Sequence, residues 1–249
     1  MIAELKSETR KIFSIRSTYI IFALMIFLIV FFGFYVGGWH TDKLDLLDPH
    51  RLYNLTLQAI SFLSIFTALV GLLLFTHEFR YNTIAYSLTL SNNRSKVLAA
   101  KIVVITILAL TVTTIIGVAS PLLSNWGIHA HHLKLVPQTF YYGALAWRGL
   151  VFGWGYAMAG LVIAALIRNQ IGAIIALFIV PDTVEGLLSI LLKNNTVYLP
   201  FSALHSMLGA GMDVSQGNIT PVHAMYVFLG YLVFSWAIAW YLFLKRDAS

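Results

Sequence analysis

The fold is decided by uncharged apolar stretches, of which the clearest is residues 55–75, with the sequence LTLQAISFLSIFTALVGLLLF. A helix that crosses a membrane needs roughly 20 apolar residues, because it rises about 1.5 Å per residue through a hydrocarbon core about 30 Å thick. This stretch has that length, and the polar sequence THEFR follows it at 76–80. It therefore predicts a membrane-spanning helix.

Five further stretches have the same character. The six candidate spans cover residues 19–37, 55–75, 102–123, 142–167, 171–192 and 223–244. They are continuous apolar runs rather than alternating strands of about ten residues, so we expect α-helices and not a barrel. The sequence thus predicts an all-α membrane protein with one six-span transmembrane domain at 17–249 and no soluble module.

The composition of the chain excludes a water-soluble globular protein. Of its 249 residues, 59% are hydrophobic and only 10% are charged, and the mean hydropathy is +0.82. Soluble domains have about a quarter of their residues charged. The chain has no Cys, which excludes disulfides and thiolate metal sites.

The basic residues predict the orientation of the spans. Eleven of the 16 Lys and Arg precede the first span, follow the sixth, or lie between spans two and three or four and five. Because basic residues concentrate in cytoplasmic segments, this distribution places both termini in the cytoplasm. The net charge of +6 is then an orientation signal, and no nucleic-acid partner is expected.

Residues 1–16 form an amphipathic segment before the first span. Apolar residues recur at helical spacing at Ile2, Leu5, Ile12 and Phe13, and the charged residues on other faces are Glu4, Glu8, Arg10 and Lys11. This pattern predicts a helix that lies in the cytoplasmic interface of the membrane, in contact with lipid. The alternative is a helical extension of the first span with a solvated basic flank.

The segment between the second and third spans, residues 76–101, is polar at its ends and half apolar in the middle. Ile84, Tyr86 and Leu88 give a short helix a small apolar face, and Thr83 and Ser87 lie beside it. An apolar face on a segment outside the membrane predicts a protein partner.

Residues of this segment resemble a family motif. Glu78-Phe79-Arg80-x-x-Thr83-Ile84, followed by Leu90, Arg94 and Val97-Leu98-x-x-Lys101, is similar to the motif of type-2 ABC (ATP-binding cassette) transporter permeases, the six-span membrane subunits of exporters. Two positions depart from that motif. Asn82 replaces a common Gly and Ser91 replaces a frequent Pro, and both replacements are compatible with a turn.

The resemblance implies that residues 82–90 contain a coupling helix that docks into a groove of a separate ATPase, with Glu78 and Arg80 holding the hairpin in shape. The docking residues it implies are Glu78, Arg80, Asn82, Thr83, Ile84, Tyr86, Ser87, Leu88 and Arg94. The alternative is an ordinary solvated loop whose charges only enforce the topology.

The chain contains no phosphate-binding G-x-x-x-x-G-K-[ST] motif, so we expect no cofactor on it, and expect ATP and Mg²⁺ on the partner ATPase. The resemblance implies two permeases, identical or different, and two ATPases in a bacterial plasma membrane. An apolar cleft favours an amphipathic substrate such as a peptide antibiotic, a lipid or a drug. The alternative functions are an intramembrane enzyme and a non-transporting anchor or sensor.

Three ionisable residues fall within the apolar stretches: Arg148, Asp182 and Glu185. Each acid costs about 2.5–3.5 kcal/mol at a helix centre, so a partner is expected. Pro181 can kink or break the fifth span, which would admit water. We predict an ion pair of Arg148 with Glu185 or with Asp182, either in the translocation path or as a structural clasp. No catalytic or metal site is predicted.

Overall fold

The computed structural model describes residues 2–42, 44–81, 83, 94–209 and 219–245, and the secondary structure of these residues is helical. Six helical segments are long and apolar enough to cross a membrane: Arg16–Trp39, Arg51–Arg80, Ser95–Ala130, Tyr142–Ile167, Gln170–Leu192 and Pro221–Lys245. The prediction of six long apolar helices is therefore confirmed in the described residues, and the chain is a multi-pass membrane protein.

The first half of the chain forms long, nearly continuous helices. They are α1 (Ile2–Ser14), α2 (Arg16–Val30), the π-helix η1 (Phe31–Trp39), the short 3₁₀-helix η2 (Asp45–Leu47), α3 (Arg51–Arg80) and α5 (Arg94–Ala130). An extended residue, Ile15, separates α1 from α2. With 30 and 37 residues, α3 and α5 are about 45 and 55 Å long, and each exceeds the predicted span at both ends.

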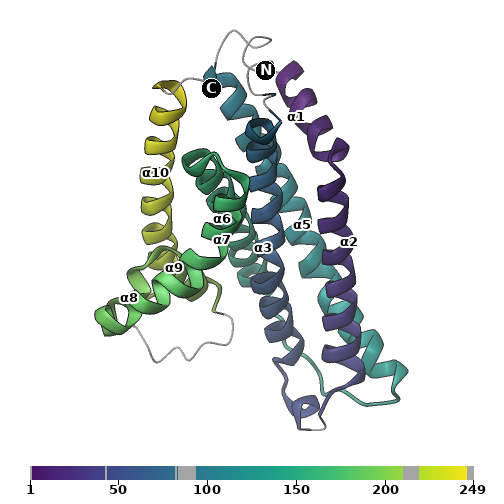
Figure 1. The fold of residues 1–249 in the computed structure, drawn as a ribbon. Coiled ribbons are helices and arrows are strands. Elements are labelled where there is room, and N and C mark those ends of the chain that lie inside the picture. Colours follow the sequence, from purple (N-terminus) through teal and green to yellow (C-terminus); the bar gives the residue numbers. More distant parts are fainter. Residues whose placement is uncertain (1, 43, 82, 84–93, 210–218, 246–249) are drawn as a thin grey trace.

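The second half is more broken. It consists of α6 (Tyr142–Ile167), α7 (Gln170–Ile179), the π-helix η3 (Val180–Val184), α8 (Glu185–Leu192), the 3₁₀-helix η4 (Lys193–Tyr198), α9 (Pro200–Leu208) and α10 (Pro221–Lys245). The end of α10 lies at the same end of the bundle as α1, which we call the α1 end (Figure 1). From there α2, α3 and α5 reach further than α6 to α10 do.

Small residues let the central helices α3 and α6 approach closely. A Cβ atom on Gly160 of α6 would lie 2.2 Å from the carbonyl oxygen of Ala68 on α3. Likewise, a Cβ atom on Gly71 of α3 would lie 2.8 Å from the carbonyl oxygen of Ala157 on α6. Side chains at either glycine would force the helices apart, so this crossing sets the distance between the two halves.

The hydrogen-bond pattern of the fifth span changes at Pro181, although the segment stays helical from Gln170 to Leu192, and we call this change the break. Helix α7 ends at Ile179, and a π-helical turn carries the chain into α8. Because proline has no amide hydrogen and its ring displaces the preceding turn, it disrupts the regular hydrogen-bond ladder. The break places Asp182 in the π-helical turn and Glu185 at the first residue of α8.

Candidate functional site

Four charged side chains, which we call the charge cluster, lie where α1, the end of α3 and the start of α5 meet: Glu8, Lys11, Glu78 and Lys101. The fully buried Lys101 has its Nζ atom 2.7 Å from Oε2 of Glu8 and 3.1 Å from Oε2 of Glu78. The Nζ atom of Lys11 lies 2.5 Å from Oε1 of Glu8 and also donates to Oε1 of Glu78. The result is a closed ring of alternating charges with no net charge.

Burial makes this ring energetically demanding. Taking a charge out of water costs several kcal/mol unless opposite charges and hydrogen bonds compensate it. Burial alone would lower the pKa of Lys11, but the carboxylates of Glu78 and Glu8 outweigh this effect and hold the pKa above its ordinary value. Lys101 also donates to the carbonyl oxygen of Leu74 at 3.3 Å. Each ammonium therefore has two carboxylate partners.

Glu8 and Lys11 of α1 were expected on a polar face of that helix, but in the structure they turn toward other helices. Glu8 is buried and Lys11 is mostly shielded, because both turn toward α3 and α5 to meet Glu78 and Lys101. The spacing of Glu8 and Lys11, three residues apart on one helical face, was a usable signal. The sequence alone could not indicate that Glu78 of α3 and Lys101 of α5 would lie beside this face of α1.

The charge cluster fixes both ends of the segment between α3 and α5. Glu78 lies in the last turn of α3 and Lys101 in the second turn of α5. The amide of Thr83 donates to the carbonyl oxygen of Glu78 at 2.9 Å, which closes the end of α3. Through Glu78 and Lys101, the two ends are therefore held to each other and to α1.

Arg80 connects the same region to the turn between α6 and α7. Its Nη1 atom donates to Oε1 of Gln170 at 3.0 Å. In that turn, Arg168 has a left-handed backbone with a φ of 55° and places its guanidinium 5.1 Å from the ring centre of Phe79. Arg168 also donates to the carbonyl oxygen of Leu242 on α10. The end of α3 is thus connected to three other membrane helices.

Five of the predicted docking residues lie outside the described part of the chain: Asn82, Ile84, Tyr86, Ser87 and Leu88. Arg94 is the first residue of α5. The coupling helix and its docking surface therefore stay predictions.

A family model described as ABC-2 family transporter protein matches residues 5–181. The chain belongs to this family. The match includes all four residues of the charge cluster, the turn between α6 and α7, and the start of η3. No curated protein matches the chain. As an ABC-2 membrane protein, the chain is a transport subunit that lacks an ATPase domain.

A second polar region of this ABC-2 membrane protein lies at the break in the fifth span. It is a cavity of about 470 Å³ between α3, α6, the α7–η3 segment and α9, which we call the polar cavity. Its lining residues are Gln58, Ser61, Phe62, Ile65, Phe66, Tyr156, Phe178, Asp182 and His205. The cavity therefore combines aromatic walls with one carboxylate and several neutral polar groups.

Glu185, three residues after Asp182, is buried and fully engaged. One carboxylate oxygen accepts from the amide of Phe201 at 2.7 Å, and the other accepts from the amide and the hydroxyl of Ser202 at 2.8 and 2.7 Å. These amides are unpaired donors in the first turn of α9, where the helix dipole also favours negative charge. Glu185 therefore joins α8 to α9.

The structure does not form the predicted ion pair of Arg148 with Glu185 or Asp182. Arg148 has no salt bridge among the described residues, and its guanidinium lies 5.5 Å from the ring centre of Trp147. The prediction sought a partner for the acids among the side chains of the fourth span and did not consider the backbone amides at the start of α9 as donors. The N-terminus of that helix supplies the donors that Arg148 was expected to provide.

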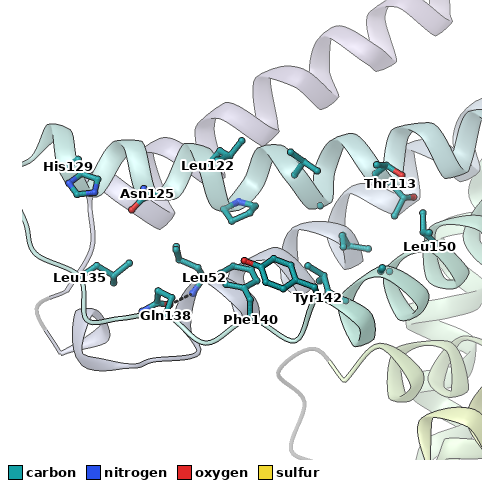
Figure 2. A pocket seen from close by; sticks show the side chains of 18 of the residues that line it. Leu52, Thr113, Leu122, Asn125, His129, Leu135, Gln138, Phe140, Tyr142 and Leu150 are labelled. Atoms are coloured by element: carbon teal, nitrogen blue, oxygen red, sulfur yellow. Dashed lines mark hydrogen bonds between the residues drawn. The ribbon is translucent and has the colours of Figure 1, made fainter.

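A larger cavity, of about 750 Å³, lies between α3, α5 and the start of α6 and is mostly apolar. Figure 2 shows Asn125, His129 and Gln138 toward one end and Thr113 and Leu150 toward the other. Gln138 fixes the segment that covers it, because its side chain accepts from the amide of Leu52 and donates to the carbonyl oxygen of Asp48, both at 3.0 Å. No sequence signal had indicated this cavity.

Proposed function

We propose that this ABC-2 membrane protein is the membrane-embedded subunit of an ATP-driven exporter in a bacterial plasma membrane, and that residues 82–90 dock on a separate ABC ATPase. The observation that carries this proposal is the charge cluster, which ties both ends of that segment to α1 through buried ion pairs. A solvated loop that only enforces topology needs no such anchorage. A segment that receives force from a partner does.

The contacts around Arg80 supply a route for that force. Arg80 bonds to Gln170 at the start of α7, and Arg168 contacts both Phe79 and α10. A displacement of the end of α3 is therefore passed to the fourth, fifth and sixth spans. ATP binding and hydrolysis on the partner would bias the spans between two arrangements, since a ligand shifts an equilibrium by its differential affinity.

The proposed assembly follows the family. ATP and Mg²⁺ belong to the ATPase, and a second permease copy completes the translocation path. The eleven basic residues that precede the first span, follow the sixth, or lie between spans two and three or four and five orient both termini to the cytoplasm. An amphipathic substrate suits the polar cavity, because apolar walls surround a few polar groups there.

The engagement of Glu185 favours transport over an intramembrane enzyme. A pair of acids could serve general acid–base chemistry only if both were available to a reacting group. Glu185 instead accepts three hydrogen bonds from α9, which leaves Asp182 without an acidic partner for such chemistry.

The proposal is tested by purifying the tagged full-length chain from its native membrane, identifying a co-purifying ABC ATPase by mass spectrometry, and measuring ATP hydrolysis by the complex. Ile84→Asp should release the ATPase or abolish transport, because a charge then replaces an apolar docking residue. The matched control is Leu44→Asp, at an 81% exposed position at the opposite end of the bundle. Unchanged association and transport in the Ile84→Asp variant would overturn the proposal, and absence of ATP hydrolysis would favour an anchor or sensor.

A further inference from the structure

Asp182 is a carboxylate at membrane depth without a partner in the described structure. It lies 12 residues after the start of α7, which corresponds to about 18 Å of helix and hence to the interior of a 30 Å hydrocarbon core. Among the described residues, its side chain forms no ion pair and no hydrogen bond. Acids in membrane spans are costly and usually belong to ligand or ion pathways.

The walls of the polar cavity suit a cation. Phe62, Phe66 and Phe178 line it together with Tyr156, and the faces of aromatic rings attract positive charge. Its described lining contains neither Lys nor Arg. Only Asp182 carries a full charge there, provided that the one histidine is neutral.

The hydrogen bonds of that histidine support a neutral ring. Nδ1 of His205 donates to the carbonyl oxygen of Phe201 at 2.9 Å, and Nε2 lies 3.4 Å from the hydroxyl of Tyr156. One donor and one acceptor are what a neutral imidazole offers, so both ring nitrogens have a partner without a second proton. The described lining of the cavity therefore combines the Asp182 carboxylate, a histidine whose two ring nitrogens both have partners, and aromatic walls.

We propose that the polar cavity binds the cationic group of an amphiphile, with the Asp182 carboxylate as its counter-ion and the phenylalanine rings as its walls. The volume of about 470 Å³ falls in the range of small-molecule sites. Gln58 and Ser61 supply neutral hydrogen-bonding groups beside the cation. That this amphiphile is the exported substrate rests on the proposed function, whereas its binding does not.

The binding test compares two probes of nearly the same shape and opposite charge, tetraphenylphosphonium and tetraphenylborate. Their affinities for the full-length chain in a nonionic detergent are measured by isothermal titration calorimetry. We expect tetraphenylphosphonium to bind at least about tenfold more tightly, because only the cation pairs with Asp182. Equal affinities for the two ions would overturn the proposal.

Substitutions in the lining of the polar cavity test whether tetraphenylphosphonium binds there. Asp182→Asn keeps the shape of the side chain and should weaken tetraphenylphosphonium binding by about tenfold. Asp42→Asn, the same change at an exposed residue outside the cavity, should leave it unchanged. Phe178→Leu should weaken binding of the cation by about two- to fivefold and that of the anion less. Wild-type binding by a folded Asp182→Asn variant would overturn the proposal.

The outcome can be separated from that of the proposed function, because the binding test needs no ATPase. If tetraphenylphosphonium binds through Asp182 but no ATPase associates, the cation site stands and the exporter proposal fails. If an ATPase associates and drives transport, while the two probes bind equally and Asp182→Asn leaves their affinities unchanged, the exporter proposal stands and the cation site fails.

Discussion

The charge cluster and the break in the fifth span differ in how their charged side chains are partnered. In the cluster, two carboxylates meet two ammonium groups, and all four charges are matched. At the break, two carboxylates lie three residues apart with no cation paired to either among the described residues. The N-terminus of α9 satisfies Glu185, and Asp182 is left for the cavity. A closed ring resists change, whereas an unmatched charge is available to a ligand.

The largest effect is expected from removing one ammonium group of the charge cluster. Lys101→Met removes the fully buried ammonium and leaves the carboxylates of Glu8 and Glu78 facing each other. We expect a loss of about 3–5 kcal/mol in the free energy of unfolding, because one partner of a buried ion pair has been removed. Thermal unfolding in detergent measures the loss.

The control for this experiment is Lys245→Met, at an exposed lysine of the same end of the bundle. Its melting temperature should stay close to that of the wild type. If Lys101→Met is no less stable than this control, the ring does not hold the end of α3 to α5.

A smaller effect is expected where Glu185 meets α9. Glu185→Gln keeps one acceptor but turns an NH₂ group toward amides that also donate, and it removes the charge favoured by the helix dipole. We expect a loss of about 1–3 kcal/mol in the free energy of unfolding. Asp182→Asn, three residues away, should leave the melting temperature unchanged, since that side chain has no described partner. Equal losses in the two variants would contradict the contrast drawn here.

The smallest effect concerns the pH dependence of the cluster. The pKa of Lys11 is raised in the folded protein, so its contribution to stability is fully present below its ordinary value of 10.5 and is lost as the pH rises through the folded value. Because Lys11 is partly exposed, we expect no more than about 1 kcal/mol. The difference in melting temperature between the wild type and Lys11→Met should therefore shrink at the most alkaline pH. A constant difference would show that Lys11 acts by packing alone.

The spans and the break could be predicted because each depends on nearby residues. The length and lack of charge of runs such as 55–75 predict a helix, and Pro181 predicts the change of helix type at Val180–Val184. The helix ends could not be predicted. Helices α3 and α5 continue beyond their apolar runs, because neighbouring helices cover residues such as Glu78 and Lys101 that lipid would reject.

The candidate site was predicted in part. The motif resemblance singled out Glu78, Arg80 and Lys101. It could not indicate that Glu78 and Lys101 pair with each other and with residues of α1, or that Arg80 contacts Gln170. For Glu185 the expected partner was a side chain, and the actual one is the backbone of α9. An acid needs donors of some kind, but composition cannot say which donors the folded chain brings near.

The amino-acid sequence by itself determined that this is a membrane protein with six long apolar helices. Each charge or unpaired backbone group placed in hydrocarbon adds its own unfavourable free energy, so this property can be read residue by residue. The tertiary structure alone decided which charges are matched. Glu8 meets Lys101 across 93 residues, and Glu185 meets Ser202 across a reversal of the chain. Electrostatic partners are chosen by distance in space, and that distance exists only after the helices have packed.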